Sequence, residues 1–284
     1  MFPFNSLRVL SFLLPSIACA AHAAGAPSMD AADTAVTYVA ENRSIMSSGI
    51  AHTFVLAHPA TLPSGVALPL VFSYHSDGGT GAGMRAGLPL ETEALTGAVF
   101  IYPNAPGGIF DTDTSNGRTV EQTFVSDVTA AMRTEFGITP GRVFIAGFSK
   151  GAFVANILGC RLGPGVIRGL GINSGGIYSI GDFGYTANGG ITCPLPAAII
   201  IWGANDTTVP FNPDGLGYRD IVKATQGCGM STTPWPVAEC VAYDSCTRGL
   251  SWCPIPNFGH GIWSAAAHAI WIVFDDLQFA NGFD

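Results

Sequence analysis

Short apolar runs alternate along this chain with longer segments in which apolar residues recur at helical spacing. The apolar runs have the length and content of strands buried on both faces, and they occupy residues 68–74, 98–102, 143–146, 166–172 and 197–202. The helical spacing occupies residues 84–95, 121–136, 152–158 and 264–279. Strands that alternate with helices through short connections predict an α/β fold, with a mostly parallel sheet covered on both faces.

Two further strand-like runs, near residues 34–40 and 50–57, precede this alternation. The segment 228–253 departs from it, because it combines four cysteines with two short strand-like runs. Residues 104–118 are polar and are expected to form a loop. Part of this loop resembles a calcium-binding loop, but its glycine is one place late and the closing glutamate is missing, so we expect no metal there. No linker or repeat is visible, and we expect a single domain over residues 24–284.

The first 23 residues have the features of a secretory signal peptide. Arg8 is followed by the apolar run 9–14, and Ala21-His22-Ala23 offers a small-x-small cleavage site. The apolar run is too short for a transmembrane anchor. Cys19 could accept a lipid, but the leucine usual three places before such a cysteine is missing. We therefore expect a cleaved leader and a secreted or periplasmic protein.

Composition supports export and excludes some partners. Charged residues make up only 11% of the chain, whereas about 25% is ordinary for globular proteins. The formal net charge of −8 argues against nucleic acid or an anionic membrane as the partner.

Seven cysteines occur, and Cys19 lies in the predicted leader, which leaves six for the mature chain. An even number in an exported protein predicts three disulfides, and the sequence leaves their pairing open. Buried free thiols are the alternative. Zinc is disfavoured because neither a C-x-x-C motif nor a histidine pair with ligand spacing occurs. The six cysteines are Cys160, Cys193, Cys228, Cys240, Cys246 and Cys253.

The strand-like run 143–146 leads into Gly147-Phe148-Ser149-Lys150-Gly151, and a helical pattern follows. This is the G-x-S-x-G pattern of a nucleophile elbow, in which a sharp strand-to-helix turn exposes a strained serine. A glycine-rich turn with a surface serine is the alternative. The flanking strand and helix favour the elbow, which predicts attack of the Ser149 hydroxyl on a carbonyl carbon.

A serine nucleophile needs a general base and a carboxylate that orients the base. Asp206 follows the buried run 197–202, so it should lie at the carboxyl end of a strand. His260 lies between Gly259 and Gly261, on a loop before the last helix. A turn aspartate and a surface histidine are the alternatives. The rival histidines fit less well, because His268 lies within the last helical pattern, and His52 and His58 lie in the early strand region.

An oxyanion hole requires two backbone N–H groups that point at the developing negative charge. The residue after the nucleophile, Lys150, should supply one. The loop after residue 74 should supply the other, from Asp77 or Ser76. A plain glycine turn is the alternative for this loop.

Taken in order, these motifs resemble the secreted α/β-hydrolase esterases that group polyhydroxybutyrate depolymerases with feruloyl esterases. The resemblance runs from about residue 51 to the last helix and rests on residues 68–79, 99–103, 124–127, 142–156, 193–206 and 259–260. It implies the α/β-hydrolase fold, with Ser149 as nucleophile, Asp206 as orienting carboxylate and His260 as base. It also implies a Cys160–Cys193 disulfide and no metal or organic cofactor.

The chain departs from this family at two places. His75-Ser76 stands where the family usually has His-Gly, and Lys150 stands where small or neutral residues are common. The Lys150 ammonium either favours acidic substrates or points to solvent, and we expect solvent. The long extracellular depolymerases carry a polymer-binding domain that is not visible here, which disfavours solid polymer as substrate.

The sequence thus predicts a monomeric serine esterase acting on feruloyl esters of plant cell walls or on hydroxyalkanoate esters. Phe148 and Trp263 are candidates for apolar walls of the substrate site, although either could belong to the core. A non-catalytic exported binding protein on the same scaffold is the alternative.

Overall fold

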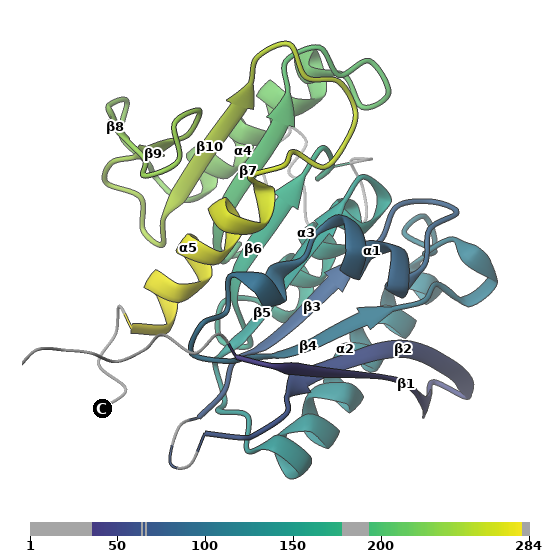
Figure 1. Ribbon diagram of the computed structural model, residues 1–284. Coiled ribbons are helices and arrows are strands. Elements are labelled where there is room, and N and C mark those ends of the chain that lie inside the picture. The colour runs from purple at the N-terminus through teal and green to yellow at the C-terminus, as the bar shows by residue number, and fades with distance from the viewer. Residues whose placement is uncertain (1–35, 64, 66, 178–192, 280–284) are drawn as a thin grey trace, which may run out of the picture. The chain divides into compact units, whose positions relative to one another are not determined.

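A single mixed sheet organises the structure (Figure 1), a computed structural model that describes residues 36–63, 65, 67–177 and 193–279. The predicted leader lies outside the described residues. Within them the sheet has ten strands in the order β1-β2-β4-β3-β5-β6-β7-β10-β9-β8. The strands are β1 (Tyr38–Ser47), β2 (Ile50–Pro59), β3 (Leu70–Tyr74), β4 (Val99–Pro103), β5 (Val143–Phe148), β6 (Ile167–Asn173), β7 (Ala197–Gly203), β8 (Thr232–Pro234), β9 (Val241–Tyr243) and β10 (Leu250–Ile255).

The six central strands, from β4 to β10 in this order, are parallel, and antiparallel strands flank them at both edges. The predicted mostly parallel sheet is therefore confirmed. Strands β3, β4 and β7 are buried along their whole length, as strands covered on both faces must be. Strand β1 pairs with β2 through a two-residue turn in which Ser48 and Gly49 have φ of 51° and 74°. Positive φ at both positions matches the twist of a tight hairpin.

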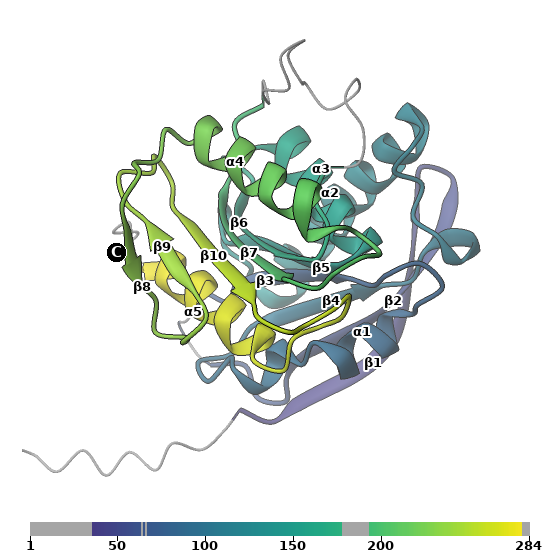
Figure 2. The ribbon, with the colours of Figure 1, turned by 90° about the horizontal axis from the view of Figure 1, so that it is seen from above.

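Helices cover both faces of the sheet (Figure 2). Apolar residues of α2, α3 and α4 pack on one face, and those of α1 and α5 pack on the other. No helix in the described part of the chain has both the length and the apolar content needed to cross a membrane. The helices are α1 (Gly81–Gly87), α2 (Ser115–Phe136), α3 (Lys150–Leu162), α4 (Leu216–Thr225) and α5 (Ala266–Phe279).

Several predicted boundaries are wrong. The strand expected near residues 34–40 is β1, which runs from Tyr38 to Ser47. The helix expected over 84–95 is split, because α1 ends at Gly87 and a separate short turn spans Leu90–Thr92. Pro89 lies between them, and a proline disfavours helical geometry in the residue before it and removes a backbone donor. The loop expected over 104–118 ends early, because α2 begins at Ser115, where the Thr114 hydroxyl accepts a hydrogen bond from the N–H of Gly117 at 2.9 Å. Helix α4 was not predicted.

Three disulfides connect the six cysteines as Cys160–Cys193, Cys228–Cys246 and Cys240–Cys253. The first confirms the pairing that the family resemblance implies, and the other two resolve the pairing that the sequence left open.

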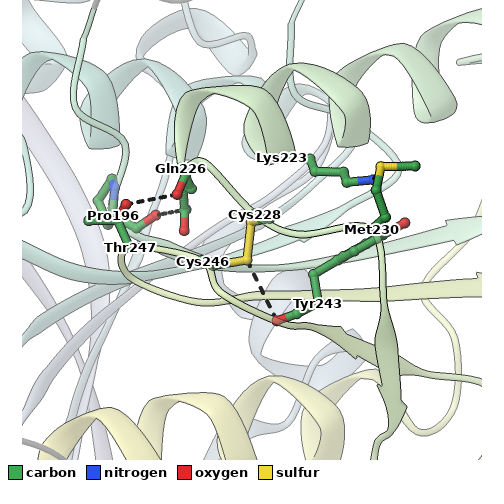
Figure 3. Close-up of a disulfide and its surroundings, with 8 residues drawn as sticks. All are labelled: Pro196, Lys223, Gln226, Cys228, Met230, Tyr243, Cys246 and Thr247. Atoms are coloured by element: carbon green, nitrogen blue, oxygen red, sulfur yellow. Dashed lines mark hydrogen bonds between the residues drawn. A yellow bond between two sulfur atoms is a disulfide. The ribbon is translucent and has the colours of Figure 1, made fainter.

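The Cys228–Cys246 bond fastens the end of α4 to the segment before β10 (Figure 3). Beside it, the Gln226 carbonyl accepts hydrogen bonds from the N–H and the hydroxyl of Thr247, at 2.9 and 2.8 Å. The buried side chain of Gln226 donates to the carbonyl of Pro196, just before β7, at 2.8 Å. The disulfide thus reinforces a junction that hydrogen bonds also hold.

Removing this disulfide should lower the free energy of unfolding. The bond closes a loop with a sequence separation of 18, for which the loss of chain entropy in the unfolded state corresponds to about 3 kcal/mol. Chemical denaturation of Cys228→Ala/Cys246→Ala should show a loss of this size, with the secondary structure retained at low denaturant. An unchanged denaturation midpoint would contradict the stabilising role.

Candidate active site

Ser149 lies at the turn between β5 and α3 and has φ 52° and ψ −118°, a strained conformation for a residue with a side chain. Its N–H donates to the carbonyl of Asn173 at 2.9 Å. Both flanking glycines are required by close backbone contacts. A Cβ on Gly147 would collide with the carbonyl of Gly151, and a Cβ on Gly151 would collide with the carbonyl of Tyr74. The turn therefore has the geometry of the predicted elbow.

The three residues predicted to react together are brought together by the fold. His260 Nε2 lies 3.0 Å from Ser149 Oγ, and His260 Nδ1 lies 2.8 Å from Asp206 Oδ2. Because a carboxylate only accepts, Nδ1 carries the proton and Nε2 is free to accept the hydrogen of the serine hydroxyl. This arrangement allows the Ser149 proton to move to His260 when the oxygen attacks a carbonyl.

Asp206 follows β7, and its side chain is completely buried. Its second oxygen, Oδ1, accepts the N–H groups of Thr208 and Val209 at 2.9 and 3.0 Å. Burial of a carboxylate is tolerated when its oxygens are hydrogen-bonded. The same bonds fix the carboxylate so that Oδ2 faces the His260 ring, whose side chain is 18% exposed.

The loop that carries His260 is held by a residue that the sequence analysis missed. Asn173, buried at the end of β6, donates from Nδ2 to the carbonyl of Gly261 at 3.0 Å. On the other side of the histidine, the Asn205 N–H donates to the carbonyl of Phe258 at 2.8 Å. A polar residue that ends an apolar strand was the available signal for Asn173.

The residues predicted for the oxyanion hole lie on two sides of the elbow. Lys150 is the first residue of α3, and Ser76 and Asp77 lie on the loop after β3. The expected solvent orientation of the Lys150 side chain is wrong. This side chain is only 12% exposed, and its Nζ lies 3.7 Å from Asp113 Oδ1. The structure therefore holds the ammonium against the loop before α2, where Asp113 offsets its charge.

The two predicted apolar walls differ in position. The Phe148 ring lies against the His260 ring, with 5.0 Å between centroids, so it borders the site. Trp263 is half-buried against the apolar cluster beneath α1 and α5, and its contact with substrate stays a prediction.

The rival histidines lie elsewhere. His268 is 57% exposed and bonds Glu93 at 2.8 Å, and His52 is buried against Phe124. Among the described residues, no cluster of three or more His, Cys, Asp or Glu could hold a metal.

No model of a known protein family matches the chain, and no curated protein sequence matches it either. Solved structures do match. An acetyl xylan esterase from Aspergillus awamori has a TM-score of 0.62 and 17% identity, with 82% of this chain and 99% of that chain covered. A ferulic acid esterase from the anaerobic fungus Anaeromyces mucronatus has a TM-score of 0.57 and 15% identity, with coverage of 86% and 94%. An S-formylglutathione hydrolase from Staphylococcus aureus has a TM-score of 0.54 and 11% identity, with coverage of 86% and 96%. The chain therefore has the α/β-hydrolase fold.

A buried carboxyl group lies on α2, outside the group formed by Ser149, His260 and Asp206. Glu121 of α2 is 5% exposed, and burial raises its pKa to about 7, while the hydroxyl of Tyr74 acts in the opposite direction. Because this pKa is higher in the folded than in the unfolded state, the folded protein binds the proton more tightly. Its contribution to stability is present below the ordinary carboxyl pKa and is lost as the pH rises through about 7.

Between about pH 5 and about pH 8, we expect the stability of the wild type to change less favourably than that of Glu121→Gln, by about 3 kcal/mol at most. Urea denaturation of both proteins at both pH values measures the difference, and the other titrating groups cancel between them. An equal pH dependence in the two proteins would contradict the raised pKa of Glu121 in the folded state.

Proposed function

We propose that this protein is an exported serine esterase in which Ser149 is the nucleophile, His260 the general base and Asp206 the orienting carboxylate. The observation that carries the proposal is the continuous hydrogen-bonded relay from Ser149 Oγ through His260 to Asp206. Its three members come from the loops after β5, β7 and β10. The strained backbone of Ser149 adds support, because such strain persists where the surrounding structure enforces it and is concentrated at functional sites.

In the proposed reaction, Ser149 Oγ attacks the ester carbonyl while its proton passes to His260 Nε2. Asp206 stabilises the imidazolium that forms. The N–H of Lys150 and an N–H of the loop after β3 stabilise the tetrahedral oxyanion. The alcohol leaves with the proton of His260, and water activated by the same histidine then hydrolyses the acyl-enzyme.

For substrates, we propose neutral carboxylic esters, either feruloyl-type esters of plant polysaccharide or short hydroxyalkanoate esters. Phe148 beside His260 offers an apolar surface to an acyl or aryl group. The Lys150 ammonium lies against Asp113, so its charge gives little preference for acidic substrates. The structural neighbours include esterases named for acetyl xylan and for ferulic acid, which supports ester chemistry by analogy of fold.

Export is proposed from two independent features. Disulfides form and persist in oxidising compartments, and three are present. The leader pattern at residues 1–23 provides the signal for export.

Ser149→Ala should abolish hydrolysis of p-nitrophenyl acetate, because no other group replaces the attacking oxygen. Asp206→Asn should lower kcat by about 10⁴-fold, because the histidine loses its tautomer and its counter-charge. Ser126→Ala, which alters a serine on the exposed side of α2, is the matched control and should retain activity. Circular dichroism checks that each variant is folded.

Undiminished hydrolysis by folded Ser149→Ala would refute the proposed nucleophile. Absence of hydrolysis by the wild type would favour a non-catalytic binding protein on the hydrolase scaffold. Rates on methyl ferulate, tributyrin and a polyhydroxybutyrate emulsion, measured side by side, choose among the ester classes.

A further inference from the structure

His75 directly follows β3 and has a hydrogen bond on each ring nitrogen. Its Nε2 lies 3.2 Å from the backbone N of Ala105, and its Nδ1 lies 2.6 Å from the carbonyl oxygen of Ser76. The Ala105 N–H can only donate, so Nε2 must be unprotonated. The Ser76 carbonyl can only accept, so Nδ1 must carry the hydrogen. The two backbone partners therefore fix one neutral tautomer.

The surroundings keep this ring neutral and in place. His75 is 2% exposed, and its ring lies against Phe110 with 4.6 Å between centroids. Burial lowers the pKa of His75, while the Ser76 carbonyl and the charge of Asp77 act in the opposite direction. A second proton on Nε2 would also break the bond from Ala105. The ring thus serves as a fixed hydrogen-bond donor rather than as an acid or a base.

The bond to Ser76 determines how the next peptide group is oriented. The Ser76 carbonyl also accepts from the N–H of Gly79 at 3.0 Å, so two donors hold it on one side of the loop. In a planar trans peptide the N–H of the following residue points the opposite way. The N–H of Asp77 is therefore directed away from the His75 ring, and it has no hydrogen-bond acceptor among the described residues.

The preceding peptide group has the reverse orientation. A Cβ built on Gly151 would lie 2.7 Å from the carbonyl oxygen of His75, so this carbonyl faces the first turn of α3. The N–H of Ser76 belongs to the same peptide plane and points away from the elbow. Of the two donors that the sequence left open, the N–H of Ser76 therefore faces away from the elbow, and the N–H of Asp77 is the one left to serve the oxyanion hole.

We propose that His75 is a positioning residue that holds the N–H of Asp77 as the second donor of the oxyanion hole, beside the N–H of Lys150. The proposal rests on the proposed esterase function. It assigns Ser76 the role of a carbonyl anchor and gives the His75 side chain a part in stabilising the transition state without contact to substrate.

Two substitutions separate this role from simple packing. An asparagine amide at position 75 can place its nitrogen where Nδ1 lies and can still donate to Ser76, whereas a glutamine amide reaches the position of Nε2 instead. We expect His75→Gln to lower kcat for p-nitrophenyl acetate by about 10²-fold with KM unchanged, because the oxyanion contact forms only in the transition state. His75→Asn should remain within about tenfold of wild type.

His52→Asn is the matched control. His52 is also 2% exposed and stacks on a phenylalanine, Phe124, at 4.8 Å, but it lies in β2 outside the triad. Its substitution should lower the melting temperature and leave kcat unchanged. Equal activity of His75→Gln and wild type, or a rise in KM at constant kcat, would overturn the proposal. So would an equal loss of kcat in the His52 control.

The tautomer can be tested without activity. Long-range ¹H–¹⁵N correlation spectra of the wild type at neutral pH should show His75 with its hydrogen on Nδ1, and a hydrogen on Nε2 would refute the geometry. If the wild type hydrolyses no ester, the proposed function fails, and the spectrum still decides whether His75 holds the Ser76 carbonyl.

Discussion

The close approach of three backbone segments at Ser149 is the constraint on which the rest of the site depends. The end of β5, the first turn of α3 and the end of β3 meet without room for a side chain at Gly147 or Gly151. The strain at Ser149 costs on the order of 1–3 kcal/mol. Hydrogen bonds from Ala152 and Phe153 to the Ser149 carbonyl, and the buried apolar face of α3, offset this cost.

This contact also brings together the nucleophile and the oxyanion hole of the proposed reaction. The elbow fixes the serine hydroxyl on one side, and on the other it brings the first N–H groups of α3 beside the loop after β3. The sheet brings the loops of Asp206 and His260 near the serine, because its strand order places β5, β6, β7 and β10 side by side. Ser149, Asp206 and His260 thus meet although the serine and the histidine are 111 residues apart.

The sequence predicted features that have local causes. The elbow, the Asp206 loop and the His260 loop each combine a strand end with glycines or a turn, and all three are found in the expected elements. Features that depend on distant contacts were missed. The Lys150 side chain is held by Asp113, and the His260 loop is held by Asn173. The polar end of β6 marks Asn173 as a candidate, but nothing in the neighbouring residues identifies the partner in either contact. The pairing of the other four cysteines could not be predicted, because it depends on where β10 lies in the sheet. The break in the helix predicted over 84–95 has a local cause, which is Pro89 itself. The helical spacing of the apolar residues on both sides of the proline nevertheless favoured one continuous helix.

The two histidines near the elbow show how hydrogen-bond partners assign different tasks to one residue type. In both rings Nδ1 carries the hydrogen. At His260 this hydrogen faces a carboxylate, which stabilises the imidazolium, and Nε2 faces a hydroxyl whose proton it can accept. At His75 the hydrogen faces a neutral carbonyl, and Nε2 faces an N–H that cannot give up its proton. A second proton on His75 would be buried and would break the hydrogen bond from Ala105, which disfavours the charged ring. One ring is therefore suited to move a proton during the reaction, and the other is suited to hold a peptide group still.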